Sequence, residues 1–152
     1  MMPYTVGLDL VEIDRIRRSM GQPRFLERVF SPAERELFAS RSFSPQTVAA
    51  NFCAKEAFAK ALGTGVRGFW LTEVSLLRDK LGKPFLVLEG RAAEIARREG
   101  LDFSVSVTHT REYASAVVIG WRKRFFLLRR SSLPWRKQSF VGGNRIEQPE
   151  NR

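Results

Sequence analysis

The segment Phe52–Gly65 reads FCAKEAFAKALGTG and decides the fold of this 152-residue chain. Its pattern predicts a helix that is apolar almost all the way round, and such helices are usually buried. The helix nevertheless carries Lys55, Glu56 and Lys60 and ends in a Gly-Thr-Gly sequence. Buried charges are costly unless they are paired or bind a metal. Four residues after Phe52, Glu56 falls on a face that should be packed, and a catalytic or metal-binding acid is expected there.

Length and composition predict one globular domain in the cytoplasm. A chain of this length can form one core of moderate size, and its hydrophobic fraction of 43% fits a soluble protein. No apolar run approaches the roughly 20 residues needed to cross a bilayer, and no signal-peptide pattern precedes the first strand. The single cysteine, Cys53, cannot form an internal disulfide. Because no apolar run is long enough to cross a bilayer, we expect no membrane contact.

The net charge of +10 is unevenly distributed. Residues 121–152 hold nine Lys and Arg against two acidic residues, whereas residues 1–120 hold 17 basic and 14 acidic residues. We predict that residues 1–120 form the domain and that residues 121–152 form a basic, partly disordered extension. Within the domain, a local excess of arginine predicts a basic surface for an acidic partner. Its residues are Arg15, Arg17, Arg18, Arg24 and Arg28.

Hydrophobic periodicity predicts an α+β fold with a mixed, mostly antiparallel sheet packed with helices. The expected strands are Val6–Val11, Leu71–Leu77, Phe85–Leu88, Phe103–His109 and Ala114–Ile119, the last two forming a hairpin. The expected helices are Asp14–Met20, one that begins at the capping signal Ser31–Glu34, Pro45–Leu62, and Arg91–Glu99.

Asp9 is a candidate site residue in the first strand. It shares a face of that strand with Gly7, and a glycine leaves room beside it for a ligand to approach. The alternative is that Asp9 is an exposed strand residue on the solvated face of the sheet. The spacing alone leaves both interpretations open.

Glu56 and Lys60 are the candidates on the long helix. At a spacing of four residues they also suit an ordinary helix salt bridge, which is the alternative to a functional role. Together with Asp9, Glu56 would supply two oxygen ligands from distant segments with no soft ligand nearby. Such a pair suits Mg²⁺ better than zinc, and a lysine one turn further along could contact phosphates bound to the same ion.

Gly63–Gly65 and His109 carry weaker signals. Glycine is common at helix ends, and the phosphate-binding Walker pattern is absent from the sequence. His109 is the only histidine, so metal sites with several histidines are excluded. A lone histidine at a strand end is more often structural than catalytic, although the hydrogen-bonding residues around it, including Thr110, suit a phosphate.

Four blocks of sequence, taken together, resemble the bacterial holo-acyl-carrier-protein synthases, the small 4′-phosphopantetheinyl transferases. The blocks are Val6–Ile16, Phe30–Glu34, Ala54–Gly65 and Ser104–Ala114. They recur in the family's order over about residues 1–120. One such block would be weak support, but four in order are specific.

The resemblance implies a reaction that supports fatty acid biosynthesis. The 4′-phosphopantetheine group would pass from coenzyme A to a serine of apo acyl carrier protein, with release of adenosine 3′,5′-bisphosphate. The resemblance also implies homotrimers with active sites between subunits. It assigns Mg²⁺ to Asp9 and Glu56, catalysis to these two residues with Lys60, and the carrier protein to Arg15, Arg18, Arg24 and Arg28. The coenzyme pocket would be lined by Lys60, Gly63, Thr64, Gly65, His109 and Thr110.

Asn51 departs from the family pattern, which usually has arginine at this position. The difference predicts that a contact to the coenzyme's phosphates is lost or rebuilt. The general base stays open between Asp9, a metal-bound water and a group on the carrier protein. Two other functions also stay open: a basic nucleic-acid-binding module that uses residues 121–152, and a carrier-protein binder without transferase activity.

Overall fold

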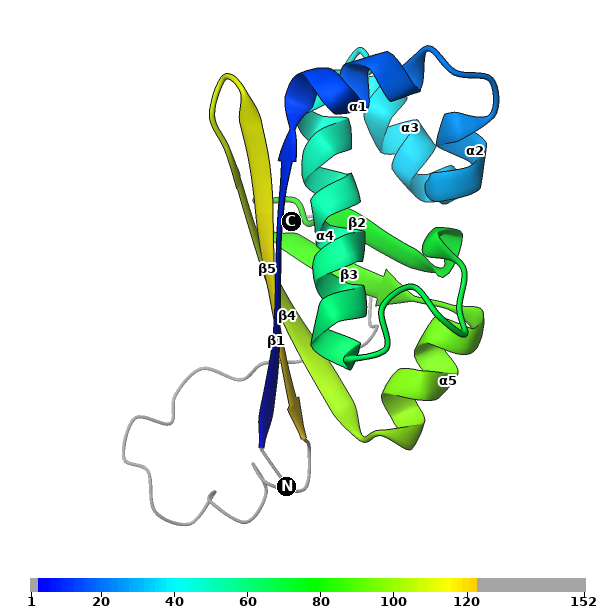
Figure 1. The fold of residues 1–152 in the computed structure, drawn as a ribbon, viewed down its shortest axis with the longest axis vertical. Helices are drawn as coiled ribbons and strands as arrows, with labels where there is room; N and C mark the ends of the chain where they lie inside the picture. Colours follow the sequence, from blue (N-terminus) through cyan, green and yellow to red (C-terminus); the bar gives the residue numbers. More distant parts are fainter. Residues whose placement is uncertain (1–2, 123–152) are drawn as a thin grey trace, which may run out of the picture.

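The computed structural model describes residues 3–122, and α4 (Pro45–Leu62) lies across one face of a three-stranded antiparallel sheet (Figure 1). The sheet has the order β1-β5-β4, and its strands are β1 (Tyr4–Glu12), β4 (Leu101–His109) and β5 (Tyr113–Arg122). A separate antiparallel hairpin contains β2 (Val74–Arg78) and β3 (Pro84–Leu88). The remaining helices are α1 (Ile13–Met20), α2 (Phe25–Val29), α3 (Pro32–Ser40), the 3₁₀ turn η1 (Leu71–Glu73) and α5 (Gly90–Arg98).

Gly7 sets the distance between α4 and the sheet. A Cβ atom at this position would lie 1.9 Å from the carbonyl oxygen of Ala57 and 2.6 Å from the amide nitrogen of Ala61. Only glycine permits this approach, because any side chain would overlap the helix backbone. The expectation that Gly7 leaves room for a ligand was therefore wrong, since the helix fills that space.

The strand register places alternate residues of β1 on opposite faces of the sheet. Asp9 pairs with Ala116 and Val11 with Ala114 of β5, and the Gly7, Asp9 and Val11 face points toward α4. The other face is apolar and exposed in the single chain. Val6, Leu8 and Leu10 are 67%, 62% and 64% exposed.

Aromatic residues join the layers beneath α4. The Phe58 ring meets the rings of Phe69 and Phe103 edge to face, with centroids 5.6 and 4.9 Å apart. Such pairs stabilise a core beyond the apolar area that they bury. Phe58 and Phe69 are both buried. The core therefore reaches from the sheet, through α4, to the segment that follows the helix.

Most predicted elements are confirmed, and the α+β class with them. Ser31 caps α3 with the expected capping box, and α4 has the predicted ends. The strand predicted over Leu71–Leu77 begins only at Val74, because η1 occupies its first residues. The predictions for residues 123–152 lie outside the described residues. Within residues 3–122, no helix is long and apolar enough to cross a membrane.

Candidate active site

Asp9 faces α4 and pairs with Lys60. The carboxylate Oδ1 accepts a hydrogen bond from Lys60 Nζ at 2.9 Å, and the same ammonium donates to the carbonyl of Leu8 at 3.0 Å. The Asp9 side chain is 14% exposed and that of Lys60 is 52% exposed. The alternative that Asp9 lies on the solvated face of the sheet is therefore wrong.

Glu56 lies one helical turn before Lys60, on the side of α4 that faces Asp9. Burial raises the pKa of Glu56, the negative charge of Asp9 raises it further, and the positive charges of Lys60 and Arg15 lower it. Within the described part of the chain, the Glu56 side chain forms no ion pair. The helix salt bridge considered for Glu56 and Lys60 is thus replaced by the bridge from Lys60 to Asp9.

Cys53 lies beside this carboxylate pair but adds no metal ligand. Its Sγ donates to the carbonyl of Ala114 at 3.3 Å. Burial raises the pKa of the Cys53 thiol well above its ordinary value, and the charge of Asp9 adds to this effect. Among residues 3–122, no group of three His, Cys, Asp or Glu side chains is arranged to hold a metal ion. The site therefore offers two carboxylates, and its chemistry is that of oxygen ligands.

The segment after α4 begins one turn beyond Lys60. Gly63 ends the helix with φ at 76°, and Gly65 follows with φ at 61°, a left-handed conformation that favours glycine. A Cβ atom at either glycine would meet no atom within 4 Å. Gly63, Thr64 and Gly65 are all exposed. The backbone there is exposed, about one helical turn beyond Lys60.

His109 ends β4 and Thr110 follows it in the turn to β5, and this turn lies at the end of the molecule opposite to the C-terminal end of α4 (Figure 1). His109 pairs in register with Ala114, whose carbonyl accepts the bond from Cys53. Gly63 lies ten residues beyond Cys53, which is about 15 Å along the helix. A single chain therefore does not bring His109 and Thr110 to the loop that was predicted to bind coenzyme A with them.

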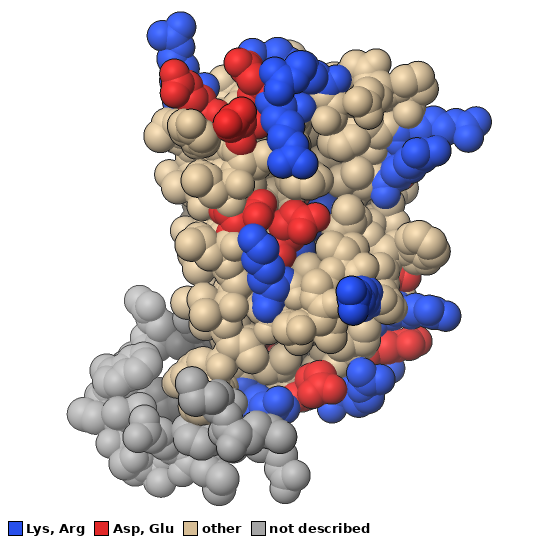
Figure 2. Space-filling model, viewed as in Figure 1, with Lys and Arg blue, Asp and Glu red and all other residues tan. Residues whose placement is uncertain are grey.

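The predicted arginine surface is formed by α1 and α2. Arg15 and Arg18 on α1, Arg24 at the start of α2 and Arg28 within it are all exposed. Figure 2 shows basic side chains over α1, with several acidic ones among them. Arg15 is close enough to Glu56 to lower the pKa of its carboxyl. The basic surface is thus adjacent to the carboxylate pair.

Asn51 lies in a buried polar cluster on another face of α4. Its Nδ2 donates to Glu34 Oε1 at 3.0 Å and to the carbonyl of Leu76 at 2.8 Å, and the residue is fully buried. In this chain the position is structural. The neighbouring ion pair between Glu34 and Lys55, with 2.6 Å between Oε2 and Nζ, was not predicted. The sequence feature that could have indicated this ion pair is the charge of Lys55 on an otherwise apolar helix.

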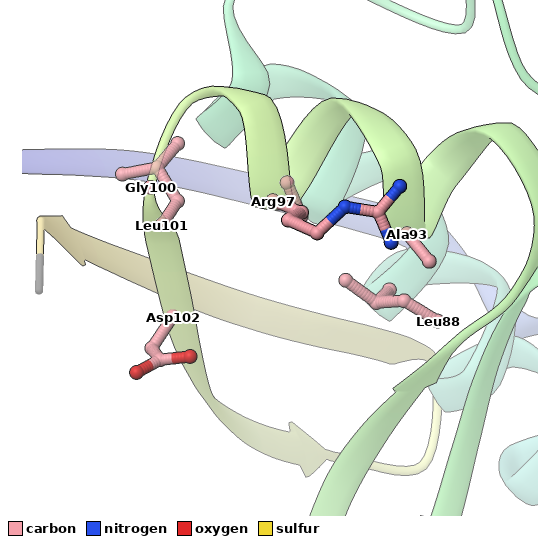
Figure 3. Close-up of a pocket in the computed structure, with 7 residues that line it drawn as sticks. Leu88, Ala93, Arg97, Gly100, Leu101 and Asp102 are labelled. Atoms are coloured by element: carbon pink, nitrogen blue, oxygen red, sulfur yellow. The ribbon is translucent and has the colours of Figure 1, made fainter.

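A hollow of about 380 Å³ lies between α5, the end of β3 and the start of β4 (Figure 3). Its lining includes Leu88, Arg97, Leu101 and Asp102, and none of the predicted site residues. Asp9 pairs with Ala116 of β5, which pairs with Val107 of β4. Val107 is six residues beyond Leu101, so about 20 Å along the strands separates Asp9 from the hollow. The candidate active site is therefore the group of Asp9, Glu56 and Lys60.

Comparisons with known proteins show the family of the chain. Residues 5–118 match the 4′-phosphopantetheinyl transferase superfamily. The holo-[acyl-carrier-protein] synthase of Clostridium novyi (strain NT) is 43% identical over 116 residues, 75% of this chain and 84% of that protein. The crystal structure of holo-[acyl-carrier-protein] synthase from Neisseria meningitidis has a TM-score of 0.74 at 30% identity, covering 80% of this chain and 100% of that chain. The Chronobacterium ammoniagenes ACPS-CoA complex has a TM-score of 0.71 at 31% identity, covering 81% and 100%. The chain therefore belongs to the 4′-phosphopantetheinyl transferase superfamily and, within it, to the holo-[acyl-carrier-protein] synthases.

Proposed function

We propose that this enzyme transfers 4′-phosphopantetheine from coenzyme A to a serine of apo acyl carrier protein in a Mg²⁺-dependent reaction that serves fatty acid biosynthesis. The observation that carries the proposal is the group of Asp9, Glu56 and Lys60. It places two carboxylates and an exposed ammonium beside an open glycine segment. This combination suits a metal-bound diphosphate such as that of coenzyme A.

Asp9 and Glu56 would hold the Mg²⁺ ion. The two carboxylates supply only oxygen ligands, and Mg²⁺ commonly takes one or two carboxylates and leaves its other positions to water and phosphate. When bound, the ion would supply positive charge against the charge that develops on the leaving phosphate. The hydrogen bond to Asp9 raises the pKa of Lys60, so its ammonium stays charged and can bind phosphate oxygens.

The pocket would be completed by a second copy of the chain. His109 and Thr110 lie about 15 Å or more from Gly63 within one chain, yet the family resemblance assigns all of them to the coenzyme pocket. The exposed apolar face of β1 offers a surface for such a contact, because large exposed apolar patches mark interaction sites. These two features support a homotrimer with its active sites between subunits.

The arginines on α1 and α2 would bind the acidic carrier protein. Their position next to Glu56 would bring the acceptor serine toward the phosphates of the coenzyme. Within residues 3–122, no feature favours the nucleic-acid alternative, since most of the basic residues on which it depends lie beyond this range. A cytoplasmic location remains a prediction.

Mass spectrometry of the carrier protein tests this function. After incubation of apo carrier protein with the enzyme, coenzyme A and Mg²⁺, we expect a gain of roughly 340 Da, the mass of one phosphopantetheine group. Asp9→Asn and Glu56→Gln should each reduce the transfer rate by roughly a hundredfold or more, whereas the exposed control Glu36→Gln should not. No mass gain with the parent enzyme would contradict the function. Full activity in both site variants would contradict the metal assignment.

A further inference from the structure

Lys55 is fully buried, and each N–H of its ammonium group has an acceptor. Nζ lies 2.6 Å from Glu34 Oε2 and 2.9 Å from the carbonyl oxygen of Leu71, and it also donates to the carbonyl of Val74. An ammonium group has three donors and no acceptor, so this arrangement uses all of them. The side chain has no donor left for a ligand and therefore acts within the fold.

Glu34 is equally well satisfied. Its Oε1 accepts from Asn51 Nδ2 and from the amide of Leu76 at 3.1 Å, and its Oε2 accepts from the amide of Ser31 at 3.0 Å as well as from Lys55. The pair thus joins α3, α4 and β2. Buried ion pairs are weak evidence for stability, because apolar residues of similar volume often serve as well. A role in fixing one conformation accounts better for its presence.

The carbonyl groups that Lys55 holds lie at the far end of the glycine segment. This segment leaves α4 at Gly63 and returns to it at Leu71, and it contains Gly63, Gly65 and Gly68 with positive φ. Glycine-rich backbone loses the most conformational entropy when it is ordered. Two contacts fix its far end against α4: the Phe69 ring on Phe58, and Lys55 on the carbonyl of Leu71.

Lys55 also directly precedes Glu56. Because the two residues are about 100° apart around α4, a Lys55 side chain held by α3 and β2 fixes the rotation of the helix that directs Glu56 toward Asp9. One buried side chain can thus affect both parts of the proposed pocket without contacting either directly. It holds the glycine segment through Leu71, and it orients the carboxylate through the helix.

We propose that Lys55, with Glu34 as its counter-ion, is a positioning residue that holds segment 63–73 against α4 and so shapes the coenzyme A site. This inference rests on the proposed function. It goes further in separating the two substrates, because among the described residues Lys55 forms no hydrogen bond or ion pair with the arginines of α1 and α2. It approaches α2 at the buried Phe30 ring, whose centroid lies 5.3 Å from Nζ. Loss of the pair should therefore affect coenzyme A more than the carrier protein.

The test is the double variant Glu34→Gln/Lys55→Met, which leaves no unpaired buried charge. We expect KM for coenzyme A to rise roughly tenfold, with KM for the carrier protein within about twofold of the parent. Amide hydrogen exchange in residues 63–70 should become faster without ligand. Val118→Ala is the control, because it creates a cavity in the buried core of β5 without touching the segment.

The outcomes separate this inference from the proposed function. An inactive parent enzyme would overturn the proposed function. An active parent and a double variant with the same KM for coenzyme A as Val118→Ala would overturn the positioning role alone. If the double variant does not fold, Glu34→Gln/Lys55→Gln keeps amide N–H donors at position 55 and still leaves no unpaired buried charge, and the same two measurements apply to it.

Discussion

At the scale of single residues, the carboxylate pair is an electrostatically unfavourable part of the molecule. Asp9 and Glu56 carry like charges on two elements that pack closely, and Lys60 compensates only Asp9 through a direct ion pair. A folded chain that keeps such a pair gives up some stability for function. The cost should be visible when no metal ion is present.

Glu56→Gln should stabilise the metal-free protein at neutral pH. Burial and the charge of Asp9 raise the pKa of Glu56, so the folded chain keeps this proton to a higher pH than the unfolded chain does. The stability that the protonated group contributes is present below the unfolded pKa and is lost as the pH rises through the folded pKa. Glutamine does not ionise, so the variant should melt about 3 °C higher at pH 7 and equally at about pH 4.

Thermal melts with a chelator measure this difference. Glu36→Gln, at an exposed position on α3, is the matched control and should show no change. Mg²⁺ should then raise the Tm of the parent but not that of Glu56→Gln, because binding to the folded state stabilises it. A variant that melts below the parent at pH 7 without metal would contradict the argument.

At the scale of elements, the contact between β1 and α4 brings the site together. Gly7 permits the helix to lie against the strand, and Asp9 is the next residue on the same face. Glu56 and Lys60 lie on either side of Ala57, whose carbonyl is closest to Gly7. The packing of these two elements therefore sets the distance between the carboxylates.

Gly7→Ala should destabilise the fold by about 3 kcal/mol or more and reduce transfer with it. The new methyl group would meet backbone atoms of α4, which cannot rotate away as a side chain can. Urea unfolding measures the stability. Gly21→Ala is the control, since a Cβ there would lie 3.4 Å from the nearest neighbour. Equal stability of the two variants would show that the strand and helix can separate at little cost.

Local patterns predicted the elements better than they predicted the contacts between them. Ser31 with Glu34, and the glycine after Leu62, specify helix ends through bonds within a few residues, and both are confirmed. The pair of Glu34 and Lys55 joins residues 21 positions apart, so no local pattern contains it. The packing role of Gly7 was missed for the same reason. Asp9, Glu56 and Lys60 were candidates from the patterns around each of them, and the family resemblance joined them into one predicted site.

At the scale of the whole molecule, shared active sites can be tested by mixing two variants. Glu56→Gln and His109→Ala should each have low activity. If a site takes Glu56 from one subunit and His109 from its neighbour, mixed trimers formed from equal amounts should recover about a quarter of the parent sites. The transfer assay after subunit exchange measures the recovery, and each variant mixed with itself is the control. No recovery after confirmed exchange would place both residues in one subunit.

Truncation tests the extension. Residues 1–122 should keep the transfer rate within about twofold, because the family match ends at residue 118. The cut belongs after Arg122, since its Nη1 donates to the carbonyl of Glu99 at 2.6 Å and its amide donates to that of Pro3 at 3.1 Å. Binding to duplex DNA at low salt, if the full chain shows it, should be lost. Transfer that fails in a folded truncation would assign the extension a part in the reaction.

The buried position of Cys53 has a chemical consequence for an enzyme whose proposed substrate is a thiol. The disulfide dimer of coenzyme A exchanges with cysteine thiolates: the thiolate attacks one sulfur of the dimer, a mixed disulfide forms, and one coenzyme A leaves as its thiolate. Burial and the charge of Asp9 keep Cys53 protonated and out of reach. The only cysteine of the chain can thus lie next to the coenzyme's phosphates without being captured by the coenzyme's own sulfur.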